Sequence, residues 1–133
     1  MEILSNISLI LNPTTFGLIL GSTIVGVLIG ALPGLSSGMA IALLLPFTIY
    51  LEPSQAIAAM AALYCGGTFG GSITAILINA PGAPPAAATA FDGFPMAQKG
   101  QAGKALGMAA VSSVVGGIIS LAVLIIFAPT LAR

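Results

Sequence analysis

A run of apolar residues at positions 16–32 carries no charge. As an α-helix, which rises 1.5 Å per residue, this run would reach about 26 Å, close to the roughly 30 Å hydrocarbon thickness of a bilayer. Asn12 and Pro13 stand just before it, and a polar residue followed by proline is typical of a helix start. We therefore predict a membrane-spanning helix over residues 16–32.

The composition extends this prediction to the whole chain. Hydrophobic residues make up 58% of the sequence and charged residues only 5%, whereas a soluble domain carries about a quarter charged residues. The 133 residues have room for about four spanning elements of roughly 20 residues each. With a net charge of zero and no basic patch, the chain is not expected to bind nucleic acid. The fold class that follows is an all-α integral membrane domain over residues 1–133, with about four hydrophobic helical segments.

The first helix is predicted to stop where proline and glycine follow, at residues 32–38. Ser36 or Ser37 can cap the next helix. The apolar segment at 39–50 is too short to span a bilayer and contains Pro46, which favours a half-helix or re-entrant segment.

Two longer helices are expected in the rest of the chain. The first covers residues 56–78, with Ser54 as its cap, and the second covers the apolar run at 105–129. Four glycines fall between Gly66 and Gly71, and each costs about 1 kcal/mol relative to alanine inside a helix. Either a neighbour packs very closely against this helix, or the helix is unwound there.

Glycines also recur at four-residue spacing, which lets helix backbones approach closely in lipid. This spacing serves either packing within one bundle or homodimerisation. The pairs and the triplet are Gly17/Gly21, Gly26/Gly30/Gly34, Gly66/Gly70, Gly67/Gly71 and Gly103/Gly107.

Two helix breaks, at residues 33–38 and 79–85, are the most informative features for function. Backbone polar groups cannot be left bare in lipid, so a broken helix must be buried in protein or line a wet cavity. In secondary transporters such breaks form the substrate and ion site. The free N–H groups after Gly34 and Pro85 would suit an anion. The alternative is a simple turn at the membrane surface. Additional hydrogen bonds would come from Ser36, Ser37, Asn79 and Thr89.

Charged residues are few, and the sequence leaves the role of Asp92 open. It can be a turn residue, a cation ligand, or a partner for Lys99 or Lys104. Glu52 is expected to be a solvated loop acid. The two lysines favour a cytoplasmic position for their loop by the positive-inside rule, which would place Arg133 across the membrane.

No catalytic set is visible in the sequence. There is no histidine, and the single Cys65 excludes an internal disulfide and metal ligation by several cysteines. The glycines and lysine at residues 100–104 do not have the spacing of a phosphate-binding loop. We expect neither an enzyme nor a bound metal or cofactor, although Na⁺ or H⁺ could serve as a coupling ion.

Taken together and in order, several segments closely resemble the N-terminal region of the TctA family, the large membrane subunit of bacterial tripartite tricarboxylate transporters. The segments are GALPGLSSG at 30–38, LLLPF at 43–47, YCGGTFGGSI at 64–73, INAPGAPP at 78–85 and TAFDGFP at 89–95. Gly100, Gly103, Ala105 and Leu106 continue the resemblance after the last of them.

The resemblance implies a multi-pass subunit of the bacterial inner membrane that imports small carboxylates, such as citrate, on a cation gradient. It implies a periplasmic solute-binding protein of the TctC type and a small membrane subunit of the TctB type as partners. It also implies a larger fold built from helical repeats, with broken helices near the substrate. Family members are several times longer, so we expect these residues to form the N-terminal portion of a longer subunit.

The motif positions carried over from the family are the candidate site. Asp92 is the candidate cation ligand, and no catalytic residue is assigned. The alternative is a non-transporting membrane scaffold whose glycines serve only helix packing. The candidate substrate-binding residues are Pro33, Gly34, Ser36, Ser37, Asn79, Pro81, Gly82, Pro84 and Thr89.

Overall fold

The structure, a computed structural model, describes residues 12–131, and it is helical with no strand within that range. Arg133 lies outside the described residues. In chain order the elements are α2 (Pro13–Gly30), α3 (Ser37–Leu44), the 3₁₀ helix η1 (Leu45–Tyr50), α4 (Pro53–Ile78), α5 (Ala86–Gln98) and α6 (Ala102–Leu131).

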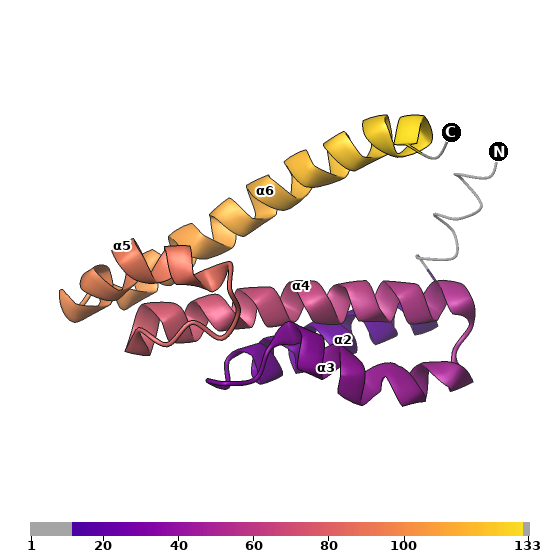
Figure 1. The fold of residues 1–133 in the computed structure, drawn as a ribbon, viewed down its shortest axis with the longest axis horizontal. Helices are drawn as coiled ribbons and strands as arrows, with labels where there is room; N and C mark the ends of the chain where they lie inside the picture. Colours follow the sequence, from indigo (N-terminus) through magenta and orange to yellow (C-terminus); the bar gives the residue numbers. More distant parts are fainter. Residues whose placement is uncertain (1–11, 132–133) are drawn as a thin grey trace.

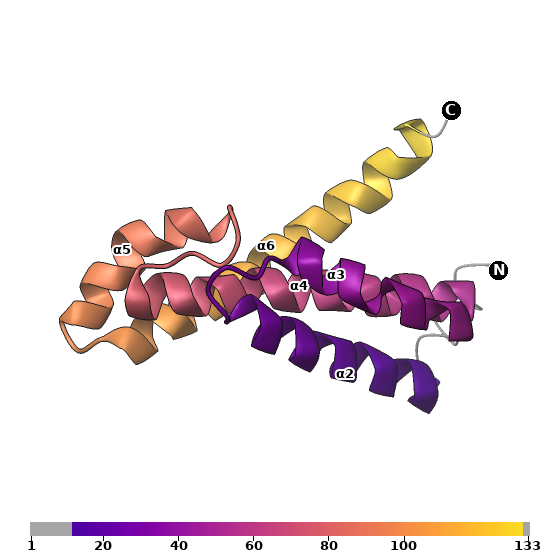
Figure 2. The ribbon, with the colours of Figure 1, turned by 60° about the horizontal axis from the view of Figure 1, so that its bottom comes forward.

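Helices α2 and α4 lie side by side and run in the same direction (Figures 1 and 2). Near the start of both helices, Gln55 Nε2 donates to Thr15 Oγ1 at 3.4 Å. At the end of α2, Gly30 packs against Gly67 of α4. From the end of α2 the chain returns through α3 and η1 to the start of α4. Helix α4 continues past the end of α2, and α5 and α6 pack against that extension before α6 diverges from the bundle.

The helix starts follow local chemistry. Asn12 Oδ1 accepts from the N–H of Thr14 at 3.4 Å and from its hydroxyl at 3.0 Å, so α2 begins as predicted. Ser36 Oγ accepts from the N–H of Met39 at 3.3 Å and caps α3. The prediction that Ser54 caps the next helix is wrong. Helix α4 begins at Pro53, whose fixed φ suits the first helical position, and no side chain caps it.

The short segment after the first break is divided next to Pro46. Proline has no N–H for an α-helical hydrogen bond, and the chain changes from α3 to a 3₁₀ helix there. Thr48 Oγ1 donates to the Leu45 carbonyl at 2.7 Å and stabilises the tighter turn. Together α3 and η1 form the short apolar helix Ser37–Tyr50, which falls short of a spanning helix.

The glycine run of α4 remains helical, and close packing is the reason. A Cβ on Gly66 would lie 2.5 Å from the Thr23 carbonyl oxygen, and one on Gly70 would collide with the Val27 carbonyl. Gly26 and Gly30 of α2 meet α4 backbone in the same way. These glycines serve packing within one chain. Other spaced glycines have open space around them, namely Gly17, Gly21, Gly103 and Gly107.

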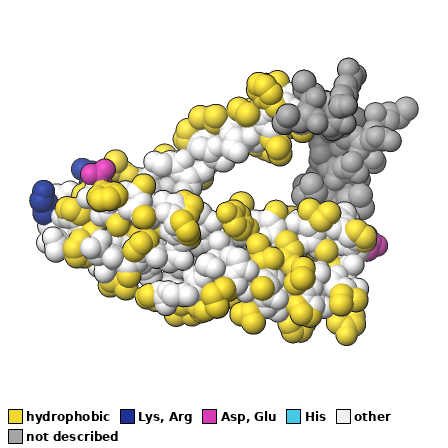
Figure 3. Space-filling model, viewed as in Figure 1, with side chains coloured by type: hydrophobic (Ala, Val, Ile, Leu, Met, Phe, Trp, Pro, Cys, Tyr) yellow, Lys and Arg dark blue, Asp and Glu magenta, His cyan; other side chains and the backbone are white. Residues whose placement is uncertain are grey.

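Three helices are long and apolar enough to cross a membrane: Pro13–Gly30, Pro53–Ile78 and Ala102–Ala128. The apolar window of the last helix is not buried at all in this chain. Figure 3 shows hydrophobic side chains over most of the visible face, with the described charges at its two ends. Such a surface is stable in lipid, and it confirms the predicted all-α membrane fold.

Candidate functional site

The second break is a segment that doubles back along α4. Asn79 ends α4 with a left-handed φ of 55°, and the N–H of Ala80 donates to the Thr74 carbonyl at 3.3 Å. The chain then returns to Gly71, whose carbonyl oxygen accepts from the N–H of Gly82 at 3.4 Å. Gly71 stands about 10 Å before the end of α4, at 1.5 Å per residue. The break therefore re-enters the helical region before α5 begins.

The first break lies beside α4 one helical turn before Gly71. It turns at Gly34, which has a φ of 92°, and the N–H of Leu35 donates to the Leu32 carbonyl at 3.1 Å. Ser37, the first residue of α3, is buried and packs against Gly67, where a Cβ would lie 2.8 Å from the Ser37 Cβ. The start of α3 is thus fixed one helical turn before Gly71.

The second break meets the end of α2 and the backbone of α4 at three glycines, which we call the glycine junction: Gly30, Gly71 and Gly82. A Cβ on Gly82 would lie 2.5 Å from the Gly30 carbonyl oxygen and 3.1 Å from the Gly71 Cα. Next to it, a Cβ on Gly71 would lie 2.9 Å from the Ala83 nitrogen. Three backbones make contact here because none carries a side chain. Segments that are far apart in the sequence thereby come together.

Helices α3 and α5 both begin beside the glycine junction. Helix N-termini carry a partial positive charge and suit anions. Some first-turn donors are already used locally. Ser36 takes the N–H of Met39, and the N–H groups of Ala86 and Ala87 donate to Ala83 and Pro84 at 2.9 and 3.2 Å.

The candidate residues differ in exposure. Ser37 is buried, whereas Ser36, Gly82 and Thr89 are half-buried. The prolines, Gly34, Asn79 and Asp92 reach the surface of this chain. These exposed positions are Pro33, Gly34, Asn79, Pro81, Pro84 and Asp92.

The interpretation of Asp92 as a turn residue is wrong. It lies inside α5, which runs unbroken through Gly93 and Pro95. Gly93 is buried because it packs on α4, where its Cβ would lie 2.6 Å from Ile76 Cγ1. The glycine therefore permits a helix contact and does not end the helix.

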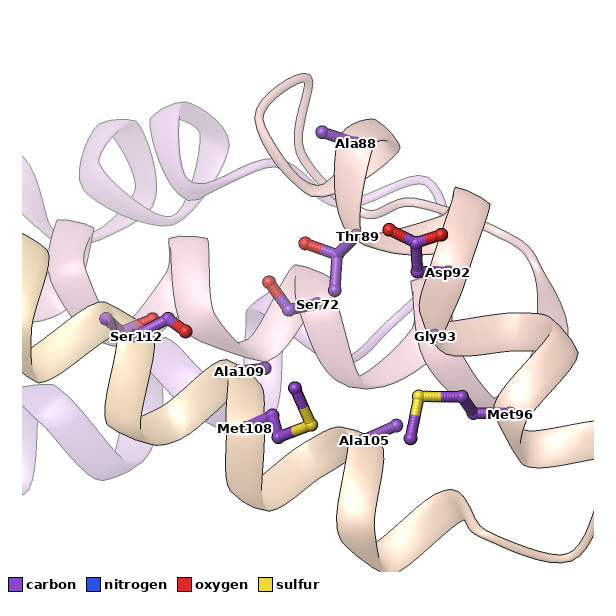
Figure 4. A pocket seen from close by; sticks show the side chains of 11 residues that line it. Ser72, Ala88, Thr89, Asp92, Gly93, Met96, Ala105, Met108, Ala109 and Ser112 are labelled. Atoms are coloured by element: carbon purple, nitrogen blue, oxygen red, sulfur yellow. The ribbon is translucent and has the colours of Figure 1, made fainter.

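A groove of about 380 Å³ lies between α4, α5 and α6 and is lined by Thr89 and Asp92 (Figure 4). Three serines that the sequence analysis did not single out share it: Ser72 from α4, and Ser112 and Ser113 from α6. Figure 4 shows Ser72 and Thr89 close together on neighbouring helices, with Ser112 further along α6. The sequence offered one signal for this groove, the adjacent Ser112 and Ser113 within the otherwise apolar run at 105–129. We call this site the oxygen-lined groove.

A second groove, of about 410 Å³, contains Asn79 and Pro81 together with Phe91 and Phe94 of α5. Four of the candidate residues are therefore distributed over two grooves that share α5, and the linings of these two grooves include none of the candidates from the first break. The groove that contains Asn79 has no acid in its lining, whereas the groove that contains Thr89 also contains Asp92.

Comparison with known proteins identifies the family. Residues 16–133 match the Tripartite tricarboxylate transporter TctA family. A protein of Agrobacterium vitis, described as an uncharacterized 52.8 kDa protein in the TAR-I ttuC' 3'region, is 41% identical over 136 residues. That match covers 99% of this chain and 27% of the relative, so the chain spans about a quarter of the relative's length. No solved structure matches the chain. The extent of the family match shows that this chain belongs to the TctA family of tripartite tricarboxylate transporters.

Proposed function

We propose that the chain forms part of the membrane subunit of a cation-gradient-driven importer of small carboxylates, of the citrate type, in the bacterial inner membrane. The observation that carries this proposal is the packing of the second break, at Gly82, against Gly71 and against Gly30, which stands three residues before the first break. Irregular backbone is tolerated at membrane depth only where protein buries it or where it lines a cavity. In secondary transporters, broken helices that meet near the membrane centre form the substrate site.

The substrate is held beside the glycine junction. The N-termini of α3 and α5 attract its carboxylates, and Ser36 donates a hydrogen bond from the first break. The amide of Asn79, about 12 Å further along α4 than Gly71, bounds the far side of the site. The prolines and glycines of the breaks keep the backbone out of helical geometry. The N–H groups of Leu35, Gly82 and Ala86 are bonded within the chain, so the substrate binds those that remain. Each charge-assisted hydrogen bond contributes about 1.5–3 kcal/mol.

The partners follow from the family. A TctC-like periplasmic binding protein delivers the carboxylate, a TctB-like small subunit completes the membrane complex, and Na⁺ or H⁺ supplies the driving gradient. The exposed apolar surface of α6, whose spanning window is unburied in this chain, provides an area for lipid and for further membrane helices.

The test is uptake of labelled citrate by the chain in its complete transporter. Asn79→Gly keeps the left-handed backbone and removes only the amide, and we expect uptake to fall about tenfold or more. Gln101→Gly removes an exposed amide at the α5–α6 turn and is the matched control, with uptake unchanged. If Asn79→Gly and Asp92→Asn both leave uptake and its cation dependence intact, the proposed site is wrong.

The competing function is a membrane scaffold, and the close α2–α4 packing through Gly26 and Gly30 favours it. Under that function, Gly26→Leu or Gly30→Leu would abolish assembly of the complex, while variants in the breaks would have no effect. Pull-down of the partner subunits, measured together with uptake, separates the two functions.

A further inference from the structure

Oxygen atoms from three helices line one side of α5. Helix α4 contributes Ser72, α5 contributes Thr89 and Asp92, and α6 contributes Ser112 and Ser113. No lysine is among the residues that line this groove. Its only formal charge is therefore the single negative charge of Asp92.

This set of ligands selects the class of ion. Hydroxyl and carboxylate oxygens are hard ligands that suit hard cations, whereas the Asp92 carboxylate repels an anion. One carboxylate neutralises one monovalent charge. The groove volume of about 380 Å³ leaves room for an ion that retains part of its water shell, since each water occupies about 30 Å³.

We propose that the oxygen-lined groove binds Na⁺, with Asp92 as the charged ligand and the hydroxyls of Ser72 and Thr89 as neutral ligands. Met96 and Met108 lie at one side of the groove (Figure 4). Their thioethers are poor ligands for a hard cation and form the apolar boundary of the site.

The position of Ser72 connects this ion to the breaks. Ser72 directly follows Gly71, whose carbonyl oxygen accepts from Gly82 in the second break and from Thr74 Oγ1 at 3.1 Å. Thr89 and Asp92 lie on α5, which begins where that break ends. An ion that ties α5 to α4 therefore fixes the position of the second break. This role in coupling rests on the proposed transport function, whereas binding of the ion does not.

The first experiment measures ion binding without transport. The chain is purified in its complete complex and its thermal unfolding is followed as NaCl replaces choline chloride at constant ionic strength. We expect a saturable rise in Tm, because a ligand that binds only the folded state stabilises it. Asp92→Asn should raise the half-saturating Na⁺ concentration about tenfold or more. Glu52→Gln, an exposed acid at the start of α4, is the control and should match the wild type.

The second experiment examines the hydroxyl of Thr89. Thr89→Val removes the oxygen and should weaken the response to Na⁺, whereas Thr89→Ser retains the oxygen and should preserve it. Thr68→Val is the matched control, because the Thr68 hydroxyl donates to the Tyr64 carbonyl at 2.9 Å within its own helix. Equal responses from Thr89→Val and Thr89→Ser would overturn the assignment of this ligand.

The outcomes separate the ion site from the transport function. If Na⁺ raises Tm no more than K⁺ or choline does, or if Asp92→Asn responds like Glu52→Gln, the ion site is refuted while carboxylate uptake can stand. If the response to Na⁺ depends on Asp92 and Thr89 but the complex takes up no carboxylate, the ion site holds and the transport proposal fails. Stabilisation by lowered pH alone, with no response to Na⁺, would also refute the site.

Discussion

Gly82 lies directly against Gly30, and a Cβ on Gly82 would be 2.5 Å from the Gly30 carbonyl oxygen. Gly30 is the last residue of α2, and Gly82 is in the segment that re-enters after α4. One contact therefore joins the second break to the end of α2, three residues before the first break. No other residue type fits there without moving one of the two backbones.

The first prediction concerns that contact. Gly82→Ala should destabilise the protein by about 1–3 kcal/mol, the usual cost of extra volume in a closely packed site. Gly107→Ala is the control, because Gly107 has open space around it and lies in α6, where alanine is the better helix former. Thermal unfolding in detergent measures both variants. Equal Tm values for the two would show that the junction is looser than described.

The second prediction addresses the packing of α2 on α4. Gly70→Leu places a large side chain against the Val27 carbonyl and should prevent a stable bundle. Gly17→Leu introduces the same side chain at a position with open space and should be tolerated. The yield of monodisperse protein in size-exclusion chromatography distinguishes them. A normal yield of Gly70→Leu would contradict the described helix contact.

The third prediction compares Ser36, which directly precedes α3, with Ser54, which lies in the first turn of α4. Ser36→Ala removes the side-chain cap of α3 and should cost about 1 kcal/mol. Ser54→Ala should leave stability unchanged within about 0.5 kcal/mol, because Ser54 caps nothing in α4. Thermal unfolding of the two variants side by side is the measurement. A larger loss from Ser54→Ala would favour the helix start expected from the sequence.

The fourth prediction concerns the left-handed conformation of Asn79. Asn79→Ala should cost about 1–2 kcal/mol more than Asn79→Gly. A Cβ is unfavourable at a φ of 55°, and alanine lacks the short polar side chain with which asparagine tolerates this conformation. Stability of both variants, measured by thermal unfolding, provides the comparison. If the two variants are equally stable, Asn79 does not hold the left-handed turn.

Proline and glycine made the breaks predictable, because they act on the backbone locally. The end of α2, the cap at Ser36 and the change at Pro46 all follow from residues within a few positions. The packing of Gly66 and Gly70 could not be decided in advance, since helix propensity contains no information about the neighbouring helix. The position of Asp92 inside a helix could not be decided in advance for the same reason. Gly93 resembles a turn signal until Ile76 is known to lie against it.

The oxygen-lined groove was only half predictable. Thr89 and Asp92 belong to a motif, but Ser72 and Ser112 join them only through the packing of three helices. Hydroxyls within helices can always bond to their own backbone, so their sequence positions alone assign them no role.

The parallel course of α2 and α4 decides how the chain runs through any layer that both helices cross. Asn12 and Glu52 precede the two helices at the same end of the bundle. The short segment Ser37–Tyr50 therefore returns the chain from the end of α2 to the start of α4, although it is shorter than a spanning helix. An observer who counted only the three long helices would alternate their directions and assign α4 the wrong orientation. Every loop after Tyr50, including the one with Lys99, would then be drawn on the opposite side of the membrane.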